Sequence, residues 1–200
     1  TKQLAELMVG SELPTPETRD STVTDQVELS VQGLGIAHIG LRPTLDDISF
    51  DVHRGEIVGI AGIEGNGQTE LIAAILGLID LNAGSVTLAG EDITAWPTRR
   101  RREAGIGYVP EDRHRHALLL DAPLWENEIL GHQSTEPNAK GPWIDRAGAR
   151  QRTTEIVERF DVRTPSIEVR AEALSGGNQQ KLIIGRELMA EPRVMIAAHP

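Results

Sequence analysis

The sequence predicts an α/β fold in which a mainly parallel sheet carries an antiparallel β flap and an inserted helical subdomain, and which is truncated after a last buried strand. A glycine-rich stretch at residues 62–70 joins an apolar run to a helical pattern, giving the order strand, loop, helix. Two strand patterns ahead of it alternate polar and apolar residues, which is typical of antiparallel strands with one solvated face. From Trp125 onward the pattern becomes helical, before it returns to a strand at the end.

The first residues predict a boundary between two domains. Gln3–Val9 has the pattern of the last turns of a helix, and Ser11–Ser21 is rich in Pro, Thr and Glu, which is typical of a linker. We therefore expect these residues to end a helix and to lead through a linker into one sizeable domain.

Strand patterns dominate the next part of the chain. Val27–Val31 and Ile48–Val52 alternate as half-buried strands do, and Ser85–Ala89 alternates in the same way. Ile57–Ala61 is apolar throughout, which predicts a buried strand, and Leu71–Leu76 predicts a helix. The two half-polar strands ahead of the apolar one, Val27–Val31 and Ile48–Val52, are expected to form the flap against a mainly parallel core.

A short helix is expected at Thr98–Ala104, and it contains the arginine run Arg99–Arg102. For this run a solvated helix face is favoured over a basic recognition patch. Ile106–Val109 predicts a buried strand, which the chain leaves through Pro110–Arg113.

The inserted part is predicted to be helical. Trp125–Leu130 is expected to form a helix, His132–Pro142 a loop and Asp145–Phe160 a long helix that Asp145 caps. The apolar face of the long helix is expected to consist of Ile156, Val157 and Phe160.

The last apolar segment, Val194–Ala198, predicts a buried strand. Because a strand here returns the chain to the sheet, we expect a core of residues 25–120 and 186–200, with the helical subdomain at residues 121–185.

The composition excludes several classes of site. The chain of 200 residues has a formal net charge of −10, which argues against a protein built to bind nucleic acid or anionic lipid. It has no cysteine, which removes disulfides and thiolate chemistry and is compatible with a reducing compartment. Aromatic residues make up only 3%, so the core must be aliphatic. No apolar run approaches the ~18–20 residues that a membrane-spanning helix needs.

The glycine-rich stretch follows the pattern of a phosphate-binding loop. In G-x-x-x-x-G-K-[ST], backbone N–H groups and a helix N-terminus cradle the phosphates. Gly62 and Gly67 match the glycines and Thr69 supplies the hydroxyl, but Gln68 replaces the lysine and its fixed positive charge. A turn that serves packing alone is the alternative. The candidate nucleotide-binding residues are Gly62, Ile63, Glu64, Gly65, Asn66, Gly67, Gln68, Thr69 and Glu70.

A second glycine motif opens the helix that is expected to continue through Met189. Ser175, Gly176 and Gly177 would offer an anion a hydroxyl, bare backbone N–H groups and the positive end of a helix dipole. Ordinary N-capping is the alternative. The residues of the motif are Leu174, Ser175, Gly176, Gly177, Asn178, Gln179, Gln180 and Lys181.

Together the two motifs resemble the Walker A loop and the signature motif of ATP-binding cassette (ABC) ATPases, which implies a P-loop NTPase fold with an ABC-type core. "LSGGNQQK" at Leu174–Lys181 and "YVPEDR" at Tyr108–Arg113 are similar to the second, C-terminal cassette of tandem-cassette importers for simple sugars. "EGNGQTEL" at Glu64–Leu71 and "IAAHP" at Ile196–Pro200 resemble the nucleoside-importing branch. The resemblance covers residues 25–200, so residues 1–24 would end the first cassette.

The departures from the family pattern imply a degenerate site. The family has a Walker A lysine, a Walker B aspartate and glutamate, and a glutamine after the preceding strand; this chain has Gln68, Ala198, His199 and Glu111 there. No catalytic residue is therefore intact, and Thr69 is the remaining candidate ligand for Mg²⁺. ATP and Mg²⁺ are expected to bind weakly or not at all at this loop. His199 as a replacement base is disfavoured, because the lysine and the aspartate are missing as well.

The resemblance also implies a set of partners. In the family two cassettes pair head to tail, and each ATP lies between one Walker A loop and the signature of the other cassette. The intact signature at Leu174–Gln180 would therefore complete an ATP site on the first cassette of the same polypeptide. The further implied partners are transmembrane permease subunits and, indirectly, a solute-binding protein, with no nucleic acid. The implied place is peripheral, on the cytoplasmic face of the membrane, in a bacterial-type importer.

The predicted function is the ATP-binding segment of an ABC importer for nucleosides or simple sugars, in which ATP hydrolysis is coupled to transport in the full-length protein and the segment alone is inactive. A soluble cassette protein that acts on ribosomes or DNA is one alternative, and the net charge of −10 argues against it. A small-molecule kinase is a second alternative, which would explain the glycine-rich loop but not the motif at Leu174–Lys181. A structural module that binds no nucleotide is the last alternative. A monosaccharide such as ribose stays open beside nucleosides as the solute.

Overall fold

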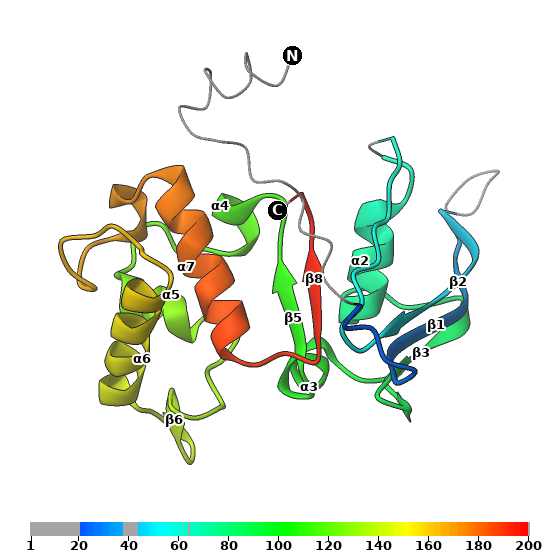
Figure 1. The fold of residues 1–200 in the computed structure, drawn as a ribbon, viewed down its shortest axis with the longest axis horizontal. Coiled ribbons are helices and arrows are strands. Elements are labelled where there is room, and N and C mark those ends of the chain that lie inside the picture. The colour runs from blue at the N-terminus through cyan, green and yellow to red at the C-terminus, as the bar shows by residue number, and fades with distance from the viewer. Residues whose placement is uncertain (1–20, 38–43, 64, 200) are drawn as a thin grey trace.

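The computed structural model describes residues 21–37, 44–63 and 65–199, which form three neighbouring parts (Figure 1). An antiparallel sheet with helix α2 lies on one side, and a parallel pair of strands lies in the middle. The helices α5, α6 and α7 form the third part, on the other side of the parallel pair (Figure 1). This arrangement confirms the predicted α/β class with a β flap and a helical part.

The half-polar segments form the antiparallel sheet, in the order β2-β1-β3-β4. Val31 of β1 lies opposite Phe50 of β2 and Val86 of β3, so one face of the sheet is continuous and apolar. That face packs against α2 in a core that includes Leu71 and Ile75. The elements are β1 (Val27–Ile36), β2 (Leu45–His53), α2 (Gln68–Leu76), β3 (Ala83–Leu88) and β4 (Glu91–Asp92).

The parallel part consists of β5 (Ile106–Val109) and β8 (Val194–Ala197), as predicted for both segments. Ile106 lies opposite Val194, and Val109 lies opposite Ala197. The prediction that the last strand is buried is only partly right, because Val194 is 8% exposed whereas Ala197 is exposed.

The prediction of a buried strand at Ile57–Ala61 is wrong. This run has no regular structure, and Ile57 and Ile60 are 97% and 56% exposed. An apolar run becomes a strand only where a neighbouring strand accepts its hydrogen bonds. Within residues 21–37, 44–63 and 65–199, β5 and β8 pair only with each other, and no strand pairs with this run. Its composition alone could not reveal the missing neighbour.

The helical part contains α4 (Arg113–His116), α5 (Leu124–Ile129), α6 (Arg146–Arg159), a 3-10 helix (Ala171–Ala173) and α7 (Gly176–Met189). Asp145 caps α6, since its side chain accepts from the backbone N–H groups of Ala147 and Gly148. Ile156 of α6 packs with Leu182 and Ile183 of α7 in a second core, as the predicted apolar face requires.

The predicted loop His132–Pro142 needs a correction, because β6 (Ala139–Lys140) pairs with β7 (Trp143–Ile144) in a small hairpin. Strands this short carry too little pattern to be read from the sequence. Helix α7 runs across the boundary drawn between residues 185 and 186, and the domain limits stay predictions. The segment Gln3–Val9 and most of the linker lie outside the described residues.

The arginine run in α3 (Thr98–Glu103) is not a solvated helix face throughout. Arg101 is 2% exposed and donates to the carbonyl oxygens of Ala74 and Ile75 at 2.8 and 2.7 Å. These carbonyls belong to the last turn of α2, where helix geometry leaves carbonyls without the usual donor four residues on; that of Ala74 also accepts from the N–H of Gly77 at 3.1 Å. One guanidinium supplies several donors at once, so Arg101 ends α2 and joins it to α3. Only Arg99 and Arg100 fit the predicted solvated face.

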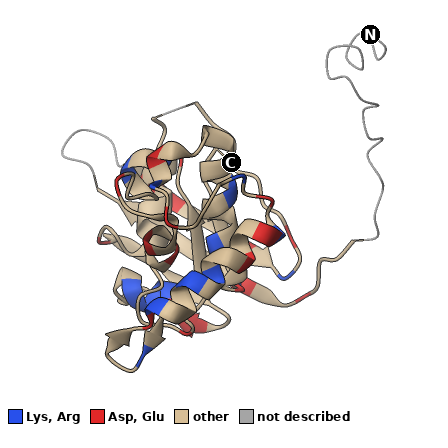
Figure 2. Ribbon diagram, turned by 90° about the vertical axis from the view of Figure 1, so that its left-hand side faces the viewer, with Lys and Arg blue, Asp and Glu red and all other residues tan. Residues whose placement is uncertain are grey.

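Charges of both signs are distributed over the side of the molecule that carries the helical part (Figure 2). Among the described helices, none combines the length and the apolar character needed to cross a membrane.

Candidate functional site

The first glycine loop is filled by the side chain of its own Gln68. The Gln68 amide oxygen accepts from the backbone N–H of Asn66 at 3.1 Å, and its Nε2 donates to the carbonyl oxygen of Ile63 at 3.1 Å. A Cβ atom on Gly62 would lie 2.4 Å from Nε2, so this glycine makes room for the amide. The residue that replaces the lysine therefore binds the loop itself.

The rest of this loop offers little to a phosphate. Helix α2 starts after Gly67, which has φ 98° and provides no side-chain cap, and the acidic Glu70 stands in the first turn. Thr69 is exposed, and Glu64 lies outside the described residues. A negative charge at a helix N-terminus stabilises the helix but competes with an anionic ligand. The loop thus keeps the backbone path of a phosphate site without its cation.

The residues near this loop do not fit a hydrolytic Mg²⁺ site. In the described ranges, no group of three or more His, Asp or Glu side chains could hold a metal ion. Ala198 carries no carboxylate, and Thr69 alone would offer a hydroxyl. Mg²⁺ is usually held by a carboxylate in addition to the phosphates of the nucleotide.

Two of the departures from the family pattern contact each other. His199 Nδ1 lies 2.9 Å from a carboxylate oxygen of Glu111, although 88 residues separate them. The strand geometry brings them together, because β5 and β8 are parallel neighbours and the N–H of Ala198 donates to the carbonyl of Val109 at 2.9 Å. Both side chains are more than half exposed, at 72% and 52%, so this contact is a solvated one.

Hydrogen bonds between its own residues hold the second glycine motif in place. Ser175 caps α7, and its hydroxyl oxygen accepts from the backbone N–H and the side-chain amide of Asn178 at 3.4 and 3.0 Å. Leu174 is buried in the second core, and Gln179 is 4% exposed. The amide of Asn178 also accepts from the backbone N–H of Arg163 at 2.9 Å.

The two glycines of this motif have different surroundings. A Cβ atom on Gly176 would lie 2.8 Å from a terminal nitrogen of Arg113, so the end of that arginine side chain would have to shift. A Cβ atom on Gly177 would meet no atom of the described residues within 4 Å. A glycine in a helix costs roughly 0.5–1 kcal/mol relative to alanine. Packing within the chain therefore gives no reason for Gly177, and a group from outside that approaches the backbone closely would give one.

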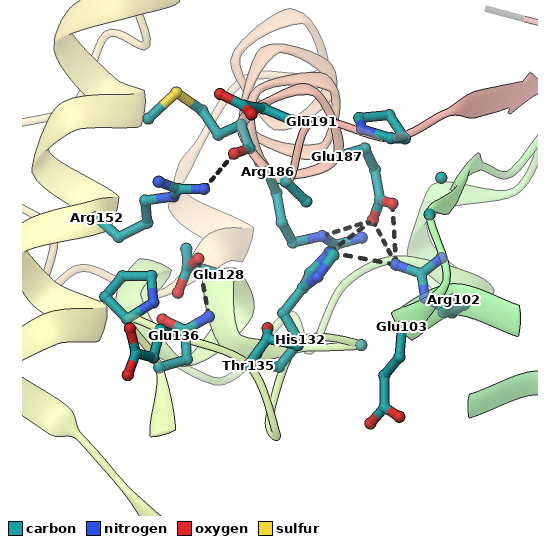
Figure 3. A pocket seen from close by; sticks show the side chains of 18 of the residues that line it. Arg102, Glu103, Glu128, His132, Thr135, Glu136, Arg152, Arg186, Glu187 and Glu191 are labelled. Carbon is teal, nitrogen blue, oxygen red and sulfur yellow. Dashed lines mark hydrogen bonds and ion pairs between the residues drawn. The ribbon is translucent and has the colours of Figure 1, made fainter. Parts of the chain in front are cut away.

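A buried charge cluster at the other end of α7 was not predicted. Glu187 is 0% exposed and accepts from Arg102 at 2.9 Å, Arg186 at 3.1 Å and the backbone N–H of Tyr108 at 3.1 Å. Figure 3 shows the side chains of Arg102, Arg186 and Glu187 beside a cavity of about 380 Å³. Residues of α3, β5 and the helical part line this cavity. Burial raises the pKa of Glu187, but the nearby His132 and the two guanidinium groups outweigh it and lower the pKa to about 2.

The cluster fixes α7 to the parallel strands. Arg186 is 6% exposed and also donates to the carbonyl oxygens of Ala117 and Asn127, both at 3.0 Å. The sequence offers little indication of this buried cluster, because Arg186 and Glu187 stand in a helical pattern in which charged residues usually face water. Their burial follows from a partner on α3, which is far away in the sequence.

Comparison with known proteins gives consistent matches. The ABC transporter family profile matches residues 45–200. The chain is 40% identical over 198 residues to the guanosine import ATP-binding protein NupO of Bacillus subtilis, covering 99% of this chain and 39% of that protein. It is 40% identical over 199 residues to the nucleoside import ATP-binding protein NupA of Lactococcus lactis, covering 100% and 39%. The ribose import ATP-binding protein RbsA 1 of Rubrobacter xylanophilus is 39% identical, with 99% and 38% covered.

Solved structures show the same fold. A nucleotide-free ATP-binding cassette from an ABC transporter aligns with a TM-score of 0.68 at 23% identity, over 86% of this chain and 68% of that one. A dimeric cassette in a post-hydrolysis state bound to ADP and Pi aligns with a TM-score of 0.68 at 22% identity, over 84% and 72%. The chain thus spans about two fifths of the length of the curated relatives that it matches, and most of a single cassette.

Proposed function

Because this chain belongs to the ABC transporter family of ATP-binding proteins, we propose that it is the second cassette of an ATPase that energises an importer for nucleosides or simple sugars. Its own Walker A loop, Gly62–Thr69, binds ATP weakly or not at all. Its signature motif, Leu174–Gln180, completes an ATP site on the first cassette of the same polypeptide. Residues 1–24 then end that first cassette, and residues 25–200 form the second.

Gly177 carries this proposal. It stands in the first turn of α7, where helix geometry leaves backbone N–H groups without partners inside the helix and the helix dipole favours an anion. A Cβ on it would meet open space among the described residues, so its lack of a side chain fits an approach from outside. A phosphate held by a second cassette is a group that requires such an approach. Ser175, which already caps the helix, offers its hydroxyl beside it.

The first loop supports the same division of roles. Gln68 satisfies the loop from within, and neither a lysine nor a Walker B carboxylate replaces what it lacks. The same contacts of Gln68 also support the alternative that this cassette binds no nucleotide at its own loop. In both cases hydrolysis takes place on the partner cassette, and the signature of this chain is required for it.

The relatives support the choice of solute and partners. Two similar proteins are named for import of guanosine and of nucleosides, and a third for import of ribose. A nucleoside is therefore proposed first and a monosaccharide second. Import requires permease subunits in the membrane, to which a peripheral ATPase binds on the cytoplasmic side. A solute-binding protein would contact the permease rather than this chain.

Uptake measurements test this function. In cells that lack the complete protein, uptake of labelled guanosine is expected to stop, while uptake of labelled ribose continues; re-expression restores it. Loss of ribose uptake alone would move the solute to the monosaccharides. Unchanged uptake of both solutes, together with sedimentation of the protein with ribosomes instead of membranes, would contradict the importer function.

A further inference from the structure

The two neighbouring glutamines of the signature motif differ in environment. Gln179 is 4% exposed, whereas Gln180 is partly exposed and its side chain forms no hydrogen bond within the described part of the chain. The sequence does not distinguish them, because both are amides in the same short motif. The structure therefore separates a residue that is built into the fold from one that faces outward.

Gln179 joins three elements. Its amide oxygen accepts from Arg113 Nε at 3.2 Å and lies 2.9 Å from His114 Nε2, both on α4. Its amide nitrogen donates to the carbonyl oxygen of Ala171, in the 3-10 helix, at 3.0 Å. Its own backbone N–H donates to the carbonyl of Ser175 at 2.9 Å. One buried amide thus holds α4 and the 3-10 helix against the first turn of α7.

Through Arg113 this clamp reaches the glycines of the signature. A terminal nitrogen of Arg113 lies 2.8 Å from the position that a Cβ on Gly176 would take, so the guanidinium lies against the backbone of the motif. Arg113 follows Glu111 by two residues, and Glu111 contacts His199 at the end of β8. A continuous set of contacts therefore connects the ends of β5 and β8 with the start of α7.

We propose that Gln179 is a positioning residue for ATP hydrolysis at the composite site: it fixes Ser175–Gly177 relative to the ends of the two parallel strands. This inference rests on the proposed function, in which the signature contacts a phosphate on the other cassette. Removal of the amide leaves Arg113 Nε and the Ala171 carbonyl without this partner, and the first turn of α7 loses its connection to α4. A displacement of about 1 Å in a catalytic group can lower a rate by about a hundredfold.

The test compares matched variants of the complete protein, assembled with its permease. Gln179→Ala is expected to lower kcat for ATP about tenfold or more with KM unchanged within about twofold, because the interaction acts in the transition state and most of the ATP contacts lie on the other cassette. Gln133→Ala, the same change at an exposed glutamine outside both glycine motifs, is the control and is expected to keep both constants. Equal kcat values for the two variants would overturn the proposal.

A second pair of variants excludes a purely structural effect. Arg113→Ala removes the half-buried arginine of the clamp, and Arg115→Ala on the same helix is its control, because the Arg115 side chain is exposed and forms no hydrogen bond in the described residues. Arg113→Ala is expected to lower kcat, and Arg115→Ala is not. Because the proposed effect of Arg113 passes through its contact with the Gln179 amide, the double variant is expected to match Gln179→Ala. Additive losses, or equal effects of Arg113→Ala and Arg115→Ala, would overturn the proposal.

Gly177→Asp separates the failure of this inference from that of the proposed function. If Gly177→Asp leaves hydrolysis intact, the signature does not contact a phosphate and the proposed function is wrong. If Gly177→Asp abolishes hydrolysis while Gln179→Ala behaves like Gln133→Ala, only the positioning role of Gln179 is wrong.

Discussion

The two glycine motifs of this chain have the same elements, a loop and a helix N-terminus, but different anchors. The loop at Gly62–Thr69 follows an exposed apolar run without strand partners, and its own Gln68 occupies it. The signature at Leu174–Gln180 begins with a buried leucine, a capping serine and a buried amide that holds α4. The signature helix is further fixed at its other end by Glu187.

This difference teaches how a cassette can keep one role and lose another. The signature is anchored in the core of the helical part, so its geometry does not depend on a bound nucleotide. The Walker A loop depends on a cation and on carboxylates, and this chain has replaced them at Gln68, Ala198 and His199. Under the proposed function, the motif assigned to the other cassette is preserved, and the motif assigned to this chain's own site is altered.

The largest expected effect concerns the chain by itself. Purified residues 1–200 are expected to show no ATP turnover above background, because the loop has no lysine at position 68 and neither an aspartate nor a glutamate stands at positions 198 and 199. A phosphate-release assay with Mg²⁺-ATP measures it. Turnover at the ~1–10 s⁻¹ of an ordinary enzyme would contradict the proposal that the first loop does not support hydrolysis.

The anchor of the signature helix can be broken at its buried end. Glu187→Gln is expected to lower the free energy of unfolding by ~3–5 kcal/mol, because Arg102 and Arg186 lose their buried counter-charge. Urea unfolding measures this. Glu158→Gln, an exposed change on α6, is the control and is expected to alter the free energy by less than ~0.5 kcal/mol. Similar values for both variants would show that the cluster does not hold α7.

The same cluster predicts a pH dependence. The pKa of Glu187 is about 2 in the folded chain against an ordinary value of 4.5, so folding favours the ionised form. Its contribution is fully present above pH 4.5 and is lost as the pH falls toward 2, in total about 3 kcal/mol. Urea unfolding at several pH values compares the native chain with Glu187→Gln. The difference between them is expected to shrink toward low pH, and a constant difference would contradict the depressed pKa.

A lysine at position 68 is expected to restore part of the ATP affinity that the first loop lacks. Gln68→Lys is expected to increase the affinity for ATP by roughly ten- to a hundredfold, since a charge-assisted contact to phosphate is worth ~1.5–3 kcal/mol. Titration calorimetry measures both affinities. Gln151→Lys on α6 adds the same charge away from the loop and controls for the net charge of −10. Equal affinities of the native chain and Gln68→Lys would reject the argument from charge.

The sequence predicted most elements because their patterns are local. The alternation in β1 and β2, the cap at Asp145 and the serine before α7 each act within a few residues. The family match and the fold of the solved cassettes agree with the resemblance that the two glycine motifs indicated. The degenerate character of the first loop stays a prediction, as do the assignments of individual site residues.

What the sequence could not predict depends on partners far away in the chain. The exposure of Ile57 follows from a missing neighbouring strand, and the burial of Arg101 follows from the end of α2. The roles of Gln179 and Glu187 follow from α4 and α3, and the contact between Glu111 and His199 follows from the parallel register. In each case the residue type was informative only after the fold had placed its partner.

The most direct test compares the two motifs in one ATPase assay on the complete protein. Gly177→Asp adds bulk and a negative charge where a phosphate would approach, and it is expected to lower hydrolysis by roughly a hundred- to a thousandfold or to abolish it. Gln68→Ala is expected to retain most of the hydrolysis, because the competent site does not use this loop. Circular dichroism confirms that both variants fold. Gln68→Ala proving as damaging as Gly177→Asp would contradict the division of roles between the two motifs.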